Sequence, residues 1–372
     1  MLQNSSLTEN KPNLDYIQAL RALAALMVVL HHAKAFLVGT VYEKLSFDLF
    51  WPGAFGVDLF FIISGFIIVY TSYDYTRKDL PTFIKKRFIR IWPLYFIATM
   101  IYALLFKNTD LSTMHGFVYS DKIDAVQSLN IIKSLLFIPL NFYDPVYFGA
   151  ATLFVGWTLN YEVYFYIVCA TGLLFSRNKY WFYALWFLTT LFIIPSFMGL
   201  ATTIRPTIEN GGYFNLTIQS VVWEFVFGAC VAILFKKNML RIKDPKKAIP
   251  LILIAFAIPA YGYVTKKNTM HGVEYFGMYY CIMFFLLTSC HQFIKDSIKI
   301  PKTILSIGDA SYSLYLLHPI VFIVLFKLKE RLLPTLDYQN FYFMFISVIV
   351  SILVSILSYN YLEKKLINIY KK

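Results

Sequence analysis

An arginine and a histidine occupy one apolar segment near the start of this chain of 372 residues. Arg21 and His32 lie eleven residues apart within residues 14–38, a stretch long enough to cross a bilayer as a helix. Eleven steps of 100° return almost to the same helix face, and they separate the two side chains by about 16 Å along the axis. Ionisable groups inside such a helix are costly and usually functional. The pair suits a site that holds an anion at one depth and moves a proton at another.

A second pair of basic residues opens a later apolar segment. Arg87 and Arg90 follow Lys85 and Lys86 at the start of residues 88–106, and their spacing places both arginines on one helix face. Ordinary anchoring at the positively charged side of a membrane explains the lysines, but Arg90 lies just inside the apolar stretch. Paired guanidinium groups match the geometry of phosphate oxygens. We therefore expect the two arginines to bind phosphate, with anchoring as the alternative.

The elements that carry these residues belong to a membrane protein. Hydrophobic residues make up 58% of the chain and charged residues 15%, and the mean hydropathy is +0.60. These values lie well outside the range of soluble domains. Windows of about 20 residues predict an all-α polytopic membrane protein with about ten transmembrane helices. The expected spans are residues 14–38, 54–73, 88–106, 153–175, 180–198, 216–235, 248–264, 273–293, 303–326 and 340–360.

Lysine and arginine are unevenly shared between the two sides of these spans. The loops on one side carry 22 basic residues together with the termini, whereas the loops on the other side carry 11. The positive-inside rule then places both termini in the cytoplasm. We expect a cytoplasmic segment at 1–13, a transmembrane domain at 14–360 and a cytoplasmic tail at 361–372. The net charge of +13 is scattered among loops, so we expect no nucleic-acid partner.

The four cysteines point to neither disulfides nor a metal. All of them fall in expected spans, and no CxxC or Cys/His spacing typical of a zinc site is present. We expect no metal and no permanently bound cofactor.

Polar side chains at similar expected depths define a candidate cavity. His32, Glu162 and His318 are expected in one layer slightly outside the membrane midplane. Asp58 is expected near the outer surface and Glu224 near the middle. Several such groups favour a polar cavity over isolated structural hydrogen bonds. For Glu162 a structural role and a catalytic role stay open, and for Glu224 a structural role is favoured.

Five segments in order resemble the integral-membrane acyltransferase-3 family, whose bacterial members O-acylate cell-surface and exported polysaccharides. The first matching pattern is Arg21, ten residues and His32, and the third is the Arg-x-x-Arg of Arg87 and Arg90. The similarity runs from about residue 14 to residue 360. The other three segments are residues 56–66 (GVDLFFIISGF), 157–166 (WTLNYEVYFY) and 311–319 (SYSLYLLHP).

The resemblance implies that acyl-CoA binds from the cytoplasm and that the acyl group reaches a hydroxyl on or near the outer face. It implies that His32 is the essential histidine and that Arg21, Arg87 and Arg90 are needed for activity. Acetyl is the commonest acyl group in the family, so acetyl-CoA is the expected donor. The most similar members modify exopolysaccharide or lipopolysaccharide, which implies a bacterial cytoplasmic (inner) membrane location. Some members carry an extra extracytoplasmic domain after the last span; none is expected in this chain, so we expect direct transfer or a separate partner.

The residues themselves fit acyl transfer to a sugar hydroxyl. Histidine suits the general base because its ordinary pKa lies near working pH, and we assign this role to His32. We expect Glu162 to orient the His32 ring, and His318 to form a second polar wall or acceptor contact. Tyr315 and Trp157 are candidate donors to a developing oxyanion. The alternative function is a proton-coupled transporter of a glycan or lipid precursor, because buried His and Glu also build proton relays.

Overall fold

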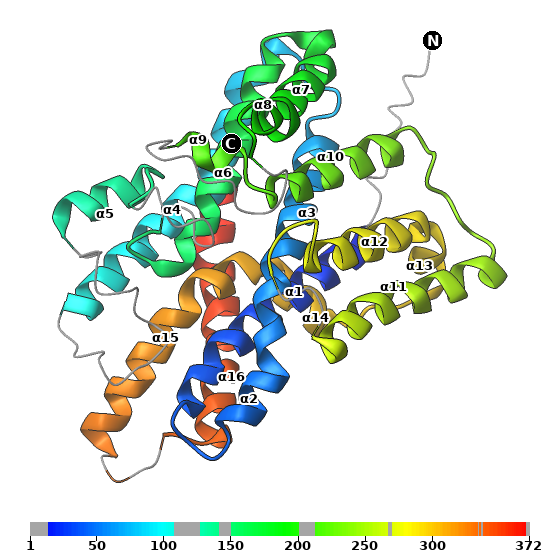
Figure 1. Cartoon of the computed structure of the whole chain (residues 1–372). Coiled ribbons are helices and arrows are strands. Elements are labelled where there is room, and N and C mark those ends of the chain that lie inside the picture. Colours follow the sequence, from blue (N-terminus) through cyan, green and yellow to red (C-terminus); the bar gives the residue numbers. More distant parts are fainter. Residues whose placement is uncertain are drawn as a thin grey trace, which may run out of the picture.

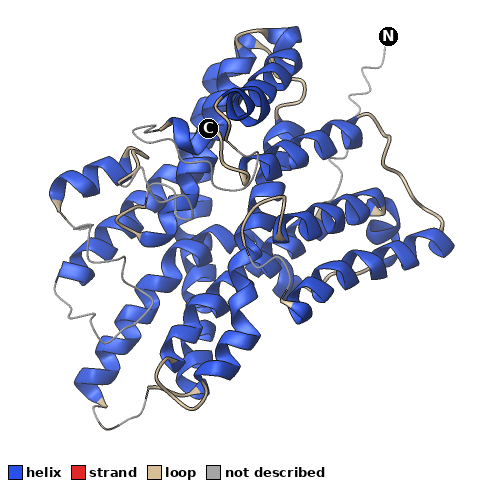
Figure 2. Cartoon of the chain, viewed as in Figure 1, coloured by secondary structure: helices blue, strands red, loops and turns tan. Residues whose placement is uncertain are grey.

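The computed structural model describes residues 14–107, 127–140, 150–200, 213–266, 270–333, 335 and 338–369. Within these ranges every regular element is helical and no strand occurs (Figure 2). The expected all-α fold is therefore confirmed. The expected cytoplasmic segment at 1–13 lies outside the described residues.

Seven helices in the described residues are long and apolar enough to cross a membrane. An eighth span results when a pair of helices that meet at a bend of 62° is counted as one. The protein is thus a multi-pass membrane protein. Including short helical extensions, the seven are Asp15–Leu37, Glu43–Thr71, Arg77–Leu105, Ser176–Phe197, Pro245–Thr265, Ser311–Leu332 and Phe341–Leu366, and the bent pair is Phe276–Ser289 with His291–Ser297.

The count of ten spans and the cytoplasmic position of both termini stay predictions. Two of the expected spans are not among the seven or eight candidates in the described residues, and their helices are shorter than the roughly 20 residues that a bilayer core requires. These are α6 (Trp157–Leu173) with 17 residues and α10 (Val222–Lys236) with 15. The ninth expected span is divided, because α14 (Lys302–Asp309) ends before α15 (Ser311–Leu332) begins.

The helices fall into those that position the site and those around them (Figure 1). The site is built by α1 (Asp15–Ala33), α3 (Gly56–Thr71), α4 (Leu80–Lys107), α6, α14, α15 and α16 (Phe341–Ser358), which continues as a π-helical turn (Tyr359–Glu363). The others are α2 (Glu43–Phe50), α5 (Ser128–Leu135), α7 (Lys179–Leu188), α8 (Ile194–Phe197), α9 (Phe214–Thr217), α10, α11 (Pro245–Thr265), α12 (Phe276–Ser289), α13 (His291–Ser297) and α17 (Lys364–Ile369).

Helix α1 packs against α3, α14 and α15 (Figure 1). Ala24 and Ala25 in its middle are completely buried, whereas Leu23 is 37% exposed. Small side chains on one face let neighbouring helices approach closely in a membrane, where packing replaces the hydrophobic effect as the driving force. This face brings the helix of Arg21 and His32 into the interior of the protein.

Two glycines set the close contact between α3 and α10. A Cβ atom on Gly65 would lie 2.1 Å from the backbone oxygen of Phe225, and one on Gly228 would lie 2.0 Å from that of Ile62. Neither position has room for a side chain, so the two backbones touch. The contact fixes the position of α3, which carries Ser64 towards the site.

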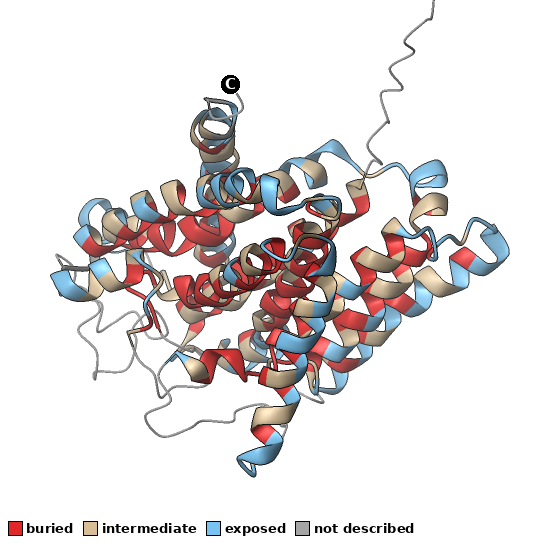
Figure 3. Cartoon of the chain, turned by 90° about the horizontal axis from the view of Figure 1, so that it is seen from above, coloured by how far each residue is buried: buried red, intermediate tan, exposed pale blue. Residues whose placement is uncertain are grey.

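Burial separates the central helices from the peripheral ones (Figure 3). In the span Ser311–Leu332, 78% of the most apolar stretch is buried within the protein, whereas in Pro245–Thr265 only 22% is buried. Exposed apolar side chains such as Leu253 and Val264 then face the bilayer, where they need no protein partner. The central helix α15 is the one that lies beside α1 at the site.

Candidate active site

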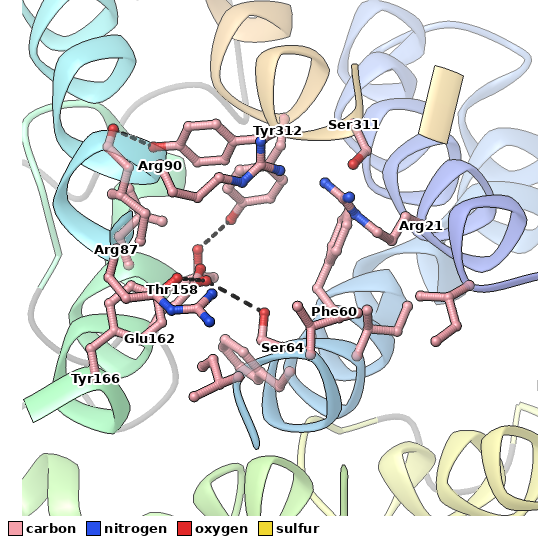
Figure 4. A pocket seen from close by; sticks show the side chains of 18 of the residues that line it. Arg21, Phe60, Ser64, Arg87, Arg90, Thr158, Glu162, Tyr166, Ser311 and Tyr312 are labelled. Atoms are coloured by element: carbon pink, nitrogen blue, oxygen red, sulfur yellow. Dashed lines mark hydrogen bonds between the residues drawn. The ribbon is translucent and has the colours of Figure 1, made fainter. Parts of the chain in front are cut away.

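A cavity of about 430 Å³ lies between α1, α3, α4, α6 and α15. Arg21 from α1 faces Arg87 and Arg90 from α4 across this space (Figure 4). Glu162 and Tyr312 also line it. The volume falls within the range of about 300–1,000 Å³ that is common for small-molecule sites. The two arginine groups found in separate segments of the sequence therefore belong to one site, which we call the arginine cavity.

Arg90 is held by a buried carboxylate. Its guanidinium forms an ion pair with Glu363, which lies in the π-helical turn after α16 and is 3% exposed. Ser313 donates to the second oxygen of the same carboxylate at 2.9 Å. The guanidinium also lies over the ring of Tyr312, 5.3 Å from its centroid. Because arginine has five N–H donors in a rigid fork, Arg90 can keep this contact and still present donors to a ligand.

Arg87 has weaker partners. Its Nη2 donates to the hydroxyl of Thr71 at 2.6 Å, and its guanidinium lies near the rings of Phe83 and Tyr166, 5.3 and 5.5 Å from their centroids. Its Nε is buried and has no hydrogen-bond partner in the described residues. An unpaired buried donor is costly unless a ligand or water satisfies it. Arg87 is therefore well suited to bind an anion.

Arg21 is fixed by a residue one turn earlier in α1. Its Nη1 donates to the side-chain oxygen of Gln18 at 3.0 Å. In the described part of the chain neither Arg21 nor Arg87 forms an ion pair with a carboxylate. The Asp309 carboxyl lies close enough to both Arg21 and Arg90 to interact with them electrostatically, without forming an ion pair with either in the described residues. Two guanidinium groups without an ion-pair partner in the described residues are thus able to meet the charge of a bound anion.

Glu162 lies in the arginine cavity rather than beside His32. Its carboxylate accepts a hydrogen bond from the Tyr166 hydroxyl at 2.6 Å and a long one from Ser64 at 3.5 Å (Figure 4). The sequence predicts from its depth that Glu162 orients His32, but in the structure the ring of His318, and not Glu162, lies at hydrogen-bond distance from His32. The depth of Glu162 did not reveal the direction in which its helix face points.

The two histidines of the expected layer meet directly. His32 Nδ1 lies 2.9 Å from His318 Nε2, although the residues are 286 positions apart in the chain. The Phe154 ring packs nearly perpendicular to the His32 ring, with a centroid separation of 5.0 Å. His318 has no exposed surface, and its Nδ1 lies 3.0 Å from the backbone oxygen of Leu314. We call His32 and His318 the histidine pair.

Helix α15 connects the arginine cavity with the histidine pair. Tyr312, Tyr315 and His318 follow one another at intervals of three residues, so they lie along one side of the helix. Tyr312 lies against Arg90, and Tyr315 lines the cavity while its ring centroid lies 6.3 Å from that of His318. The Tyr315 hydroxyl donates to the backbone oxygen of Val155 at 2.8 Å. Its single proton is thus already used, which argues against the oxyanion-donor role assigned from the sequence.

The remaining candidates lie outside the arginine cavity. Asp58 is completely buried and accepts hydrogen bonds from His271 Nδ1 at 2.6 Å and from the Gly272 amide at 2.8 Å. Glu224 lies fully buried beside Asp58, and Trp157 packs near His271 with ring centroids 6.0 Å apart. These contacts tie the segment before α12 to α3 and α6, which is a structural role.

Comparison with known proteins gives the family. The model of an acyltransferase domain family, acyltransferase-3, matches residues 14–360, nearly the whole chain. This chain belongs to the acyltransferase-3 family. Membership makes the protein an acyltransferase, in agreement with the resemblance seen in the sequence. No solved structure matches the chain.

Two relatives illustrate the range of acyltransferase-3 proteins that this chain is similar to. ExoZ, an exopolysaccharide production protein of Rhizobium meliloti (strain 1021), is 27% identical over 324 residues, which cover 86% of this chain and 90% of ExoZ. The O-acetyltransferase OatA of Staphylococcus aureus is 26% identical over 370 residues, which cover 95% of this chain. The matched part is 56% of OatA, so the chain spans little more than half the length of that relative.

Two residues of this acyltransferase-3 chain, Glu363 and His271, were not predicted from the sequence. Glu363 is the only acidic residue in 341–372, at the end of a strongly apolar segment, and that isolation was a usable signal. His271 lies in the connection before α12, where neither a motif nor an apolar span marks it. Among the described residues no group of three or more His, Cys, Asp or Glu side chains could hold a metal.

Proposed function

We propose that this protein transfers an acyl group, most simply acetyl, from cytoplasmic acyl-CoA to a hydroxyl of a cell-surface or exported glycan. One observation carries the proposal: three arginines surround one cavity, and His32 lies eleven residues beyond Arg21 on the same helix. Coenzyme A carries phosphates at one end and the thioester at the other, joined by a long thin arm. The separation of about 16 Å between arginine and histidine along α1 suits that shape.

The arginine cavity is the proposed site for the phosphates of the donor. Arg21 and Arg87 lack carboxylate partners in the described residues, and a planar guanidinium can bind two phosphate oxygens at once. Arg90 is held in place by Glu363 and contributes its remaining N–H groups. Thr71, which bonds Arg87, is exposed at the end of α3 that the distribution of basic residues predicts to be cytoplasmic. Acyl-CoA would enter there.

His32 is the proposed general base. The glycan hydroxyl oxygen attacks the thioester carbonyl carbon while His32 takes the hydroxyl proton. The carbon–sulfur bond then breaks, and His32 returns the proton to the CoA sulfur. One ester bond replaces one thioester bond, so the reaction is balanced in atoms and protons and needs no further reactant.

The proposed acceptor and the proposed membrane location are inferred from the relatives. ExoZ is named for exopolysaccharide production and OatA is named an O-acetyltransferase, which supports an acetyl group and a glycan hydroxyl. Both source organisms are bacteria, so the proposed location is the bacterial cytoplasmic membrane, the one in contact with cytoplasmic CoA.

Purified protein in lipid nanodiscs, given acetyl-CoA labelled in the acetyl group, tests this proposal. With glycan from cells that lack the gene, we expect acceptor-dependent release of CoA and transfer of label to the glycan. Mass spectrometry of surface glycans with and without the gene should then show a mass difference of one acyl group per modified sugar. A transporter would give neither CoA release nor the mass difference, and that outcome would overturn the proposal.

A further inference from the structure

We propose that His318 is a positioning residue that fixes the ring tautomer of His32, so that His32 Nε2 is the nitrogen that accepts the substrate proton. The inference rests on the proposed function, in which His32 is the general base. It concerns a residue that contacts neither the donor phosphates nor the cavity that binds them. It follows from two hydrogen bonds, one from His318 to the backbone of Leu314 and one between His318 and His32.

The first hydrogen bond fixes His318. Its Nδ1 lies 3.0 Å from the backbone oxygen of Leu314, one turn earlier in α15. A carbonyl oxygen can only accept, so Nδ1 must carry a proton. The ring has no exposed surface and contacts no carboxylate in the described residues, conditions under which imidazole is neutral. A neutral ring protonated at Nδ1 presents an unprotonated Nε2.

The second hydrogen bond determines which ring nitrogen of His32 carries the proton. His318 Nε2 lies 2.9 Å from His32 Nδ1, and since Nε2 can only accept, His32 Nδ1 must donate. The two ring planes differ by 17° and their centroids are 5.0 Å apart. That separation is close to the nitrogen–nitrogen distance plus two ring radii, so the rings meet edge to edge and the lone pair of Nε2 points at the N–H. The geometry is that of a hydrogen bond rather than of stacked faces.

The consequence is a defined base. A neutral His32 with its proton on Nδ1 carries its lone pair on Nε2, and that atom has no hydrogen-bond partner in the described part of the chain. An isolated imidazole takes either tautomer. In the other tautomer of His32 the proton would be on Nε2, so Nε2 could not accept the proton of the substrate hydroxyl. When His32 takes the hydroxyl proton, its Nδ1–H continues to donate to His318. The proton on Nε2 is then the one returned to the CoA sulfur.

The position of His318 predicts which kinetic constant it controls. It does not line the arginine cavity and is completely buried, so it cannot contact the CoA phosphates. Its loss should therefore reduce kcat and leave the KM for acetyl-CoA unchanged. A general disturbance of the fold would affect both constants.

Two substitutions separate the hydrogen bond from the packing. In His318→Gln the side-chain oxygen can reach the place of Nε2 and still accept from His32. In His318→Phe a ring of similar size fills the same space without a nitrogen. We expect His318→Phe to lower kcat by about 10²-fold, within the range of general-base contributions, and His318→Gln to recover a large part of that loss. Equal activity of His318→Phe and wild type would overturn the inference.

The tautomer can also be measured without turnover. Solid-state NMR of protein labelled with ¹⁵N-histidine in lipid bilayers distinguishes protonated from unprotonated ring nitrogens, and the His32 signals are assigned by their loss in His32→Gln. We expect wild-type His32 to be protonated at Nδ1 alone, and His318→Phe to show the Nε2–H form. A wild-type His32 protonated at Nε2 would overturn the inference, even if the variants fold poorly.

These results are separable from a failure of the proposed function. If His32→Gln keeps full activity, His32 is not the base and the proposed mechanism falls, whatever the tautomer. If His32→Gln is inactive while His318→Phe is fully active, the mechanism stands and only the role of His318 falls.

Discussion

Arg90 of α4 and Glu363 after α16 form a partly buried ion pair across 273 residues of sequence. The Arg90 side chain is 28% exposed and that of Glu363 only 4%. Removing two charges from water is costly, and removing one partner of such a pair leaves the other charge uncompensated. Glu363 therefore holds a cationic donor in the arginine cavity before any phosphate arrives.

This pair predicts a link between stability and donor binding. Glu363→Gln should lower the midpoint of thermal unfolding, with a loss of about 1–3 kcal/mol, less than the ~3–5 kcal/mol of fully buried pairs because Arg90 is partly exposed. A bound CoA phosphate can take the place of the missing carboxylate. The rise in midpoint on adding CoA should therefore be larger in the variant than in wild type.

The matched control is Glu330→Gln, which removes an exposed carboxylate near the end of α15. It should behave as wild type in both the midpoint and the CoA-induced rise. An equal CoA-induced rise in Glu363→Gln and wild type would show that Arg90 does not meet the phosphates.

The arginines of α4 should tolerate lysine poorly. Arg87→Lys and Arg90→Lys keep the charge but lose the planar fork, so each should weaken CoA binding by about tenfold, which is the loss of roughly one charge-assisted hydrogen bond. Titration calorimetry with CoA in nanodiscs measures this directly. Arg77→Lys changes an exposed arginine three residues before α4 and serves as the control. If all three variants bind CoA alike, the arginines of α4 are membrane anchors.

His32 and its neighbour His31 offer an internal comparison. His32→Gln should lower acyl transfer by at least about 10²-fold while CoA affinity stays unchanged, because the ring is outside the arginine cavity. His31 Nδ1 instead contacts the backbone oxygen of Trp51 at 2.9 Å, so His31→Gln should retain transfer. Steady-state rates of transfer of a labelled acetyl group, measured for His32→Gln and His31→Gln, distinguish the two variants. Similar rates for both variants would remove the reason to assign catalysis to His32.

The depths of the site residues could be predicted from the sequence, but their directions could not. Membrane thickness and the rise per residue set the depth of each position within a span, which is why His32 and His318 were expected in one layer. The direction of a helix face depends on how its neighbours pack. Glu162 has a similar expected depth, yet its side chain lines the arginine cavity and accepts a hydrogen bond from Tyr166 of the same helix, and it does not contact His32 in the described residues. Close contacts between helices, such as that of Gly65 with the Phe225 backbone, depend on which helices are neighbours, and a single sequence does not reveal them.

The boundaries of the spans are a second feature that the sequence predicts poorly. A hydropathy window averages over short polar breaks, so residues 303–326 are predicted to form one span. The structure breaks this segment at Ala310; just before the break, Gly308 packs against the backbone of Gln18 in α1 and Asp309 lies close enough to interact with Arg21 and Arg90. Residues at the break therefore appear in the sequence as ordinary parts of one helix.

The direction of transfer is the prediction that most depends on membrane orientation. The distribution of basic residues predicts that the arginine cavity lies at the cytoplasmic end of the spans, and His32 lies farther along α1 towards the predicted outer side. We therefore expect the donor on the cytoplasmic face and the acceptor on the outer face. Right-side-out vesicles loaded with acetyl-CoA should modify an impermeant glycan added outside.

Inside-out vesicles provide the reciprocal experiment. With acetyl-CoA added outside, they should modify only glycan trapped in the lumen, and vesicles carrying His32→Gln should modify neither. Transfer that requires both substrates on the cytoplasmic face would contradict the cross-membrane route. It would point to a lipid-linked sugar precursor as the acceptor and would leave the acyltransferase assignment intact.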